Sequence, residues 1–161
     1  MTPTAHTATT NAAGSTDMTY GTARIASLSI TTAAGKVGAA ILLLVFGFHA
    51  YWAAGGAWGA ATAYGSPELP PQTATAVVAV LIACAAVLLL ARIGVLAVPL
   101  PRWTLRAGTW VLVVVFTLAG VTNLIQDPEA YARDWHIYFF GPLLLTLAAL
   151  CAIAERSTPP R

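Results

Sequence analysis

The residues best suited to chemistry in this chain are polar or ring-bearing side chains inside apolar stretches. One block, from His49 to Gly59, reads HAYWAAGGAWG. On a helix, His49 and Trp52 would share a face with Gly56 and Gly59 because their spacings are close to whole turns. Burying an imidazole in hydrocarbon without a partner costs several kcal/mol, so His49 is expected to face another helix or a water-filled recess. It is either a ligand, proton-handling or substrate-contact residue, or a neutral histidine hydrogen-bonded across the bundle.

Trp52 and Asn123 are the other two candidates. Trp52 lies next to the paired glycines on the His49 face and could form the wall of a pocket, whereas most other aromatic side chains fit a belt at the membrane surface. Asn123 lies near the end of a later apolar stretch, where a buried amide needs partners; it is expected either to bond His49 or a loop, or to cap its helix. The predicted ligand-binding set is therefore His49, Trp52 and Asn123, with no catalytic residue.

No metal or cofactor is predicted. His136 begins the last apolar stretch at the outer membrane boundary, whereas His49 would lie roughly 8 to 15 Å inside that boundary at 1.5 Å per residue, and this difference in depth argues against a shared haem. The spacing of Asp127, Glu129 and Asp134 ahead of His136 matches no recognised zinc signature. Nucleotide-binding loops and serine-elbow motifs are also absent from the sequence.

Four uncharged apolar stretches must position these side chains. Of the 161 residues, 58% are hydrophobic and only 9% are charged, against about 25% charged in soluble domains. Such a chain cannot form a solvated globular surface, so its apolar excess must face lipid. The sequence predicts an all-α integral membrane protein with four transmembrane helices in an up-down-up-down bundle.

The membrane domain is expected over residues 36–157, with spans at about 37–59, 73–97, 105–126 and 135–155. The second span is expected to continue past Arg92, whose side chain would snorkel to the interface. Asp134 is expected to cap the fourth. Residues 1–35, rich in Thr, Ala, Ser and Gly, are predicted to be a disordered cytoplasmic tail, and residues 158–161 a short cytoplasmic tail.

Cations indicate the orientation. In a four-span arrangement only Arg133 falls on one side, and the other side holds all remaining Lys and Arg residues of the spans, loops and flanks. The positive-inside rule then predicts a plasma-membrane protein with both termini in the cytoplasm. A net charge of +2 without a basic stripe gives no footprint for nucleic acid. The expected partners are the lipid bilayer and its anionic headgroups.

The block from His49 to Gly59, with the proline-rich loop and the helix start at Thr73–Val80 after it, resembles a small bacterial integral membrane family known as domain of unknown function 3995. The resemblance covers roughly residues 37–155. It implies a four-helix membrane protein and no assigned activity. Where that family often has Leu before the paired glycines, this chain has Ala54.

Three classes of function follow. The first is a non-enzymatic accessory or scaffold protein that engages another membrane protein or a second copy of itself. The second is a protein that binds or transports a small apolar or cationic solute in a pocket around His49, Trp52 and Asn123, in the outer half of the bilayer. A membrane enzyme comes third, because catalysis usually needs several convergent polar groups and the sequence offers few.

Overall fold

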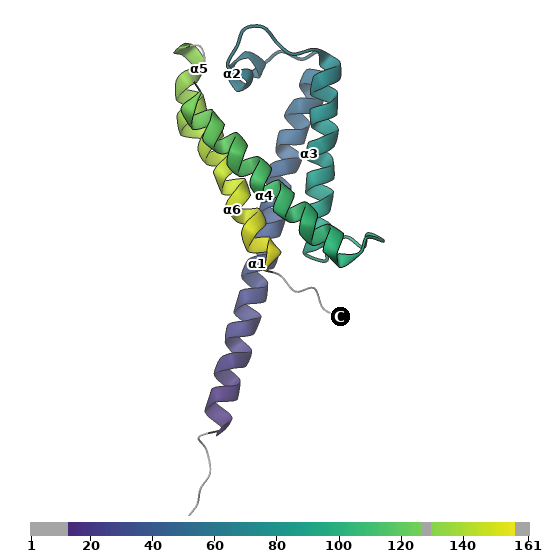
Figure 1. Ribbon diagram of the computed structural model, residues 1–161, viewed down its shortest axis with the longest axis vertical. Coiled ribbons are helices and arrows are strands. Elements are labelled where there is room, and N and C mark those ends of the chain that lie inside the picture. The colour runs from purple at the N-terminus through teal and green to yellow at the C-terminus, as the bar shows by residue number, and fades with distance from the viewer. Residues whose placement is uncertain (1–12, 127–129, 157–161) are drawn as a thin grey trace, which may run out of the picture.

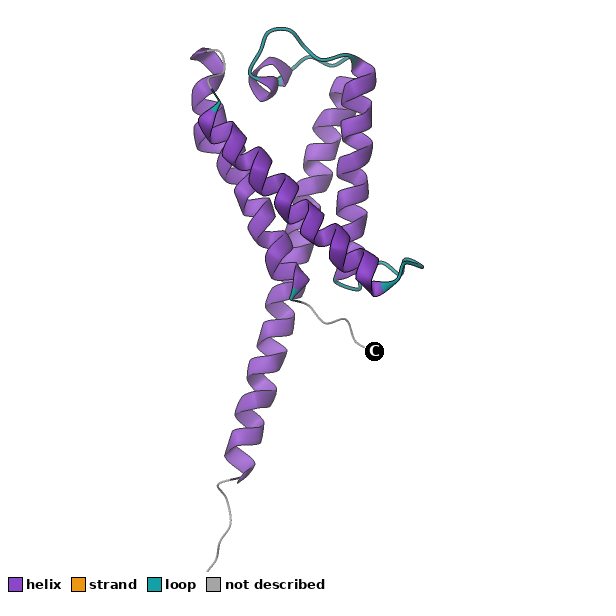
Figure 2. Ribbon diagram, viewed as in Figure 1, coloured by secondary structure: helices purple, strands orange, loops and turns teal. Residues whose placement is uncertain are grey.

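The computed structural model describes residues 13–126 and 130–156, and these residues form helices and loops with no strand among them (Figures 1 and 2). Four helical segments are long and apolar enough to cross a membrane: Leu28–Ala53, Gln72–Arg92, Arg102–Ile125 and Tyr131–Glu155. The prediction of an all-α protein with four membrane-spanning helices is confirmed. The expected tail at residues 158–161 lies outside the described residues.

Helix α1 spans Ala13–Ala53, and its first part extends well beyond the ends of the other helices (Figure 1). The disorder expected for residues 1–35 is therefore corrected for residues 13–35, while residues 1–12 lie outside the described part. The physical reason is composition: alanine is the best helix former, and no proline occurs between Pro3 and Pro67. Adding residues to an existing helix is also far easier than nucleating a new one.

The first span ends earlier than expected, at Ala53 instead of residue 59. Gly55 has φ +98° and Gly59 has φ +73°, a left-handed conformation that glycine adopts without the steric cost of a Cβ. The chain turns at Gly55 and again at Gly59, and then forms the short helix α2, Ala60–Tyr64. The shared helical face predicted for His49, Trp52, Gly56 and Gly59 thus holds for the first two residues only.

Helix α3 spans Gln72–Arg92 and stops five residues before the expected end at residue 97. Gly94, which follows the C-cap residue Ile93, takes φ +77° and turns the chain away from the helix axis. Helix α4, Arg102–Ile125, starts slightly before the expected residue 105, with Pro101 at its N-cap. Proline suits this position because the first amide groups of a helix need no intrahelical acceptor.

The fourth span combines helix α5 (Ala130–Trp135), a π-helical turn η1 (His136–Phe140) and helix α6 (Gly141–Glu155). Asp134 lies inside α5, so its predicted role as an N-cap is wrong; the helix begins several residues earlier. In η1 the Gly141 amide donates to the His136 carbonyl, five residues back. Pro142 explains this wider turn, because its ring lacks an N–H and crowds the preceding helical turn.

The spans pack as two pairs, α1 with α3 and α4 with α6 (Figure 1). Small residues allow close approach within the second pair: a Cβ added to Gly120 of α4 would lie 2.9 Å from the Leu145 side chain of α6. The fully buried cluster joins α1, α3 and α6, and its largest members are Leu42, Leu89 and Leu147. A bundle of consecutive antiparallel helices was predicted; the division into two pairs was not.

The two ends of the bundle differ. At the basic end, α3 and α6 finish and α4 begins, near most of the cations. At the aromatic end, defined by His49, Trp52, Tyr64 and His136, the two pairs lie apart in Figure 1, and α2 lies between α5 and α3. The helix pairs are therefore joined by a different set of contacts at each end.

Candidate functional site

The aromatic end holds two of the three predicted site residues in direct contact. The His49 and Trp52 ring centroids are 4.9 Å apart, and Tyr64 of α2 closes the group at 5.6 Å from Trp52 and 6.5 Å from His49. The turn at Gly55 carries the chain back toward α1, and the Trp52 indole Nε1–H donates to the Trp58 carbonyl at 2.9 Å. The first-helix block thus folds onto itself.

His49 bonds within its own helix. Its Nδ1 lies 2.9 Å from the Val45 carbonyl, so this nitrogen carries a proton and donates. The bond satisfies one ring nitrogen locally, one turn back along α1. Of the two interpretations of His49, hydrogen bonding across the bundle is not what the structure has, because the partner belongs to α1 itself.

Asn123 is not brought to the other two predicted residues. It lies on α4, in the other helix pair, and its side-chain amide donates to the Ala119 carbonyl at 2.8 Å. The bond to His49 expected for it is therefore wrong, since the amide group is used one turn back on its own helix. In the described part of the chain, no hydrogen bond joins the Asn123 side chain to a loop, and its bond to the Ala119 carbonyl does not cap the end of α4.

A small cavity of about 170 Å³ does open beside Trp52. Tyr64 and Gln72 lie on its other sides, with Gly55 and Gly56 forming part of its wall. The Tyr64 hydroxyl is buried without a hydrogen-bond partner, so one polar atom beside this space is unsatisfied. Neither His49 nor Asn123 lines the cavity, which makes Tyr64 and Gln72 the residues that sequence reasoning missed.

A larger groove of about 380 Å³ lies on the outer surface of α1. It is lined almost entirely by apolar atoms of five residues: Leu44, Gly47, Phe48, Tyr51 and Trp58. Trp58 folds back over the helix so that its ring stacks with Phe48 at 6.2 Å. All of its lining residues except Trp58 belong to the first span, where the surrounding medium is lipid.

His136 fastens α2 to the fourth span. It is only 4% exposed, and its Nε2 lies 3.1 Å from the Thr62 carbonyl of α2. Tyr131 of α5 adds a longer contact, its hydroxyl 3.5 Å from the Ala61 carbonyl. Nδ1 of His136 is buried without a partner. The sequence placed His136 at the start of the fourth span but gave no sign of α2, because a five-residue helix between glycines has no measurable periodicity.

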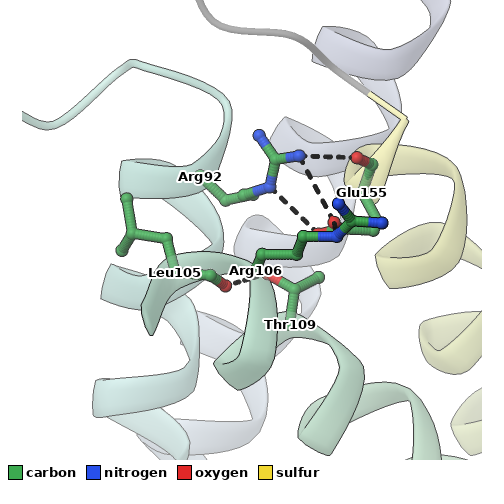
Figure 3. Close-up of polar contacts among 5 residues, drawn as sticks. All are labelled: Arg92, Leu105, Arg106, Thr109 and Glu155. Atoms are coloured by element: carbon green, nitrogen blue, oxygen red, sulfur yellow. Dashed lines mark hydrogen bonds and ion pairs between the residues drawn. The ribbon is translucent and has the colours of Figure 1, made fainter. Parts of the chain in front are cut away.

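At the basic end a buried carboxylate joins three helices (Figure 3). Arg92 of α3 donates through Nε to Glu155 Oε2 at 3.0 Å and through Nη2 to the Glu155 carbonyl at 2.6 Å. Arg106 of α4 lies 3.2 Å from the other carboxylate oxygen. The Arg92 and Glu155 side chains are only 12% and 7% exposed. The expectation that Arg92 snorkels to the interface is therefore wrong; it turns inward because a counter-charge is available.

One sequence signal could have found this cluster. Glu155 is the single acidic residue close to a large group of cations at that end of the spans: Lys36, Arg92, Arg102, Arg106 and Arg156. An isolated carboxylate at a helix end within reach of two arginines is a strong candidate for a buried pair. Neighbouring Thr109 is also fully buried and donates to the Leu105 carbonyl at 2.9 Å (Figure 3).

Among the described residues, no group of three or more His, Cys, Asp or Glu side chains could hold a metal ion. The predicted acidic loop residues Asp127 and Glu129 lie outside the described part. The two cysteines are both free thiols, Cys151 buried and Cys84 exposed.

The comparison with known families finds a match over residues 42–151, which is about two thirds of the chain. The matching family is described as "Protein of unknown function (DUF3995)". This chain belongs to that family. The resemblance inferred from the sequence is thereby confirmed. No curated protein matches the chain, and no solved structure does either.

The DUF3995 match covers residues from both ends of the bundle. Its limits, residues 42 and 151, enclose the aromatic cluster and Arg92 and Arg106 but stop before Glu155. The projecting part of α1 also lies outside it. The description of the family assigns no chemistry, and the membrane character of the chain rests on its four apolar helices.

Proposed function

We propose that this DUF3995 protein is a non-catalytic accessory or scaffold protein of the plasma membrane. One observation carries the proposal: α1 continues past the bundle as a helical arm (Figure 1). The arm, residues 13–27 ahead of the span Leu28–Ala53, is about 22 Å long at 1.5 Å per residue. A helix joined rigidly to a membrane span is suited to contact another membrane protein or a second copy of this chain.

The bonding of polar side chains inside the spans supports a structural role for them. Three threonines, Thr109, Thr117 and Thr146, donate to carbonyls one turn back on their own helices. His49 and Asn123 do the same. Groups already engaged by their own backbone are poor candidates for proton transfer or nucleophilic attack, which is why an enzyme ranks last among the three classes.

We place both termini, and hence the arm, in the cytoplasm. The basic end carries five cations and the aromatic end only Arg133 among the described residues, and cations resist translocation. The test uses single cysteines in a background lacking Cys84 and Cys151. A cysteine at Glu68 should react with an impermeant reagent outside intact cells, whereas one at Arg102 should react only after lysis. The reverse pattern would overturn the orientation.

The scaffold proposal is tested by photo-crosslinking of the full chain in native membranes. A photoreactive residue in place of Ala23, on the arm, should give a discrete crosslinked species of higher mass. The matched control replaces Val87, an exposed position in the middle of α3, and should crosslink mainly to lipid. If both positions give only lipid adducts, the arm has no protein partner and the proposal fails.

A solute-binding function is the second candidate, and the cavity beside Trp52 supports it. Two aromatic rings, Trp52 and Tyr64, stand next to the unsatisfied Tyr64 hydroxyl and the Gln72 amide. Aromatic faces attract small cations, so tetramethylammonium is a suitable probe. It should raise the melting temperature of the wild type and of Trp110→Leu but not of Trp52→Leu. Equal responses of the two variants would remove this candidate.

A further inference from the structure

At the basic end, two guanidinium groups, those of Arg92 and Arg106, pair with the single carboxylate of Glu155. Both oxygens of the Glu155 carboxylate are occupied, Oε2 by Arg92 and Oε1 by Arg106 with a longer 3.4 Å contact from Arg92. Arg106 reaches the carboxylate through Nε, and its side chain remains 72% exposed. In the described part of the chain, its two terminal Nη groups have no hydrogen-bond partner. Two of its nitrogens therefore remain as donors toward the surroundings (Figure 3).

Further cations surround this exposed guanidinium. Arg102 precedes Arg106 by one turn on α4 and is exposed on the same side of the helix. Arg156 follows Glu155, and Lys36 follows Gly35, where an added Cβ would lie 2.5 Å from the Ile93 side chain and 3.5 Å from that of Ala154. With Glu155 as the only described carboxylate there, the local charge is strongly positive.

The depth of the charged cluster in the membrane determines which anions can reach the Arg106 side chain. Arg102 begins one span, and Arg92 and Glu155 end two others, so the cluster lies where hydrocarbon gives way to headgroups. Trp103, between Arg102 and Arg106 on the first turn of α4, is 72% exposed. Indole rings at such positions prefer the headgroup layer of a bilayer. Phosphates are the anions present at this level.

We propose that Arg106 and Arg102 bind the phosphate of an anionic phospholipid headgroup. Guanidinium presents two parallel N–H groups that match phosphate oxygens. The ion pair with Glu155 holds the Arg106 Nε inward, so the outer edge of the guanidinium is already oriented toward the headgroup layer. Such preorganisation lowers the entropy lost when the lipid binds. The inference does not depend on the proposed scaffold function.

The experiment uses the full chain in nanodiscs of phosphatidylcholine with and without phosphatidylglycerol. Native mass spectrometry measures how much of each lipid stays bound after release from the disc. The wild type should retain phosphatidylglycerol in preference, and Arg102→Gln or Arg106→Gln should each weaken the preference about fivefold. Arg106→Lys should recover only part of it, because lysine keeps the charge and loses the paired donors.

Two controls keep the outcome interpretable. Arg133→Gln changes a cation at the opposite end and should leave the lipid preference unchanged. Arg102→Gln has no contact with Glu155, so it tests the site even if Arg106→Gln lowers stability; melting in pure phosphatidylcholine checks the fold of each variant. Equal retention by wild type and both glutamine variants would overturn the proposal. Inorganic phosphate that stabilises the wild type in phosphatidylcholine, without any lipid preference, would overturn the lipid assignment in favour of free phosphate.

Discussion

Different interactions hold the helices together at the basic end and at the aromatic end of this bundle. At the basic end, charged side chains of three helices converge on the Glu155 carboxylate beside the buried apolar cluster of α1, α3 and α6. At the aromatic end, the helix pairs lie apart and α2 connects them through single hydrogen bonds and ring contacts. Removing one group should therefore have a large effect at the first end and a small one at the second.

The difference follows from the cost of burying charge. A buried guanidinium without a counter-charge is expensive, so Arg92 and Glu155 constrain each other strongly. Losing a single hydrogen bond to a backbone carbonyl, such as that from His136 to the Thr62 carbonyl, costs less than leaving a buried charge without its counter-charge. We therefore expect the basic end to be the more rigid part of the molecule and α2 to open more easily than the helices at that end.

The largest expected effect comes from Glu155→Gln. The variant leaves the nearly buried Arg92 side chain without a counter-charge, so the free energy of unfolding should fall by about 3 kcal/mol. Thermal unfolding in nanodiscs measures the change, with Glu68→Gln at the opposite end as the control. Similar melting temperatures for the two variants would show that the charged cluster does not hold the basic end.

Gly120→Ala tests the packing that links the second helix pair. The new Cβ would meet the Leu145 side chain at 2.9 Å and its backbone nitrogen at 3.1 Å, so α4 and α6 must shift. We expect a loss of about 1–3 kcal/mol. Gly47→Ala is the matched control, since a Cβ there meets nothing within 4 Å, and alanine should stabilise α1 slightly. Equal effects would argue against close packing at Gly120.

His136→Phe tests the attachment of α2. The substitution keeps a ring in the buried site and removes the donor to the Thr62 carbonyl, which should cost about 1 kcal/mol. Amide exchange over Ala60–Tyr64 should rise, while exchange in α3 stays unchanged. His49→Phe, which loses only a bond within α1, is the control and should leave exchange in α2 as it is. Unchanged exchange in both variants would mean that ring contacts alone hold α2.

Asn123→Leu should have the smallest effect. Its amide bonds only the Ala119 carbonyl of its own helix, so stability should change by no more than about 0.5 kcal/mol. The response of the melting temperature to tetramethylammonium should match that of the wild type. A large loss of that response would restore Asn123 to a shared site with Trp52.

The sequence predicted correctly the features that depend on one helix or on one apolar stretch alone. The four spans, the family and the pairing of His49 with Trp52 follow from hydropathy and from spacing along one helix. The sequence did not predict the hydrogen bonds and ion pairs whose partner lies on another helix. A bond from Asn123 to His49 across the bundle was one of the alternatives, and Arg92 was directed to the interface, because spacing along one helix says nothing of which helix lies opposite.

The helix ends show the same limit. Gly55, Gly59 and Gly94 are visible in the sequence, but a glycine in an apolar stretch is as compatible with a packing surface as with a left-handed turn. Residues 13–35 looked like a tail because they lack apolar periodicity, yet α1 extends through them from an anchored span.

The sequence by itself determined the class of this protein, the number of its spans and the gathering of most cations at one end of them, because lipid selects for apolar length and excludes charge regardless of packing. Only the tertiary structure decided that Glu155 joins Arg92 and Arg106, that α2 rests on His136, and that Trp52 faces Tyr64 instead of Asn123. The reason is physical: hydrophobic length acts on each helix alone, whereas hydrogen bonds and ion pairs depend on which two surfaces meet.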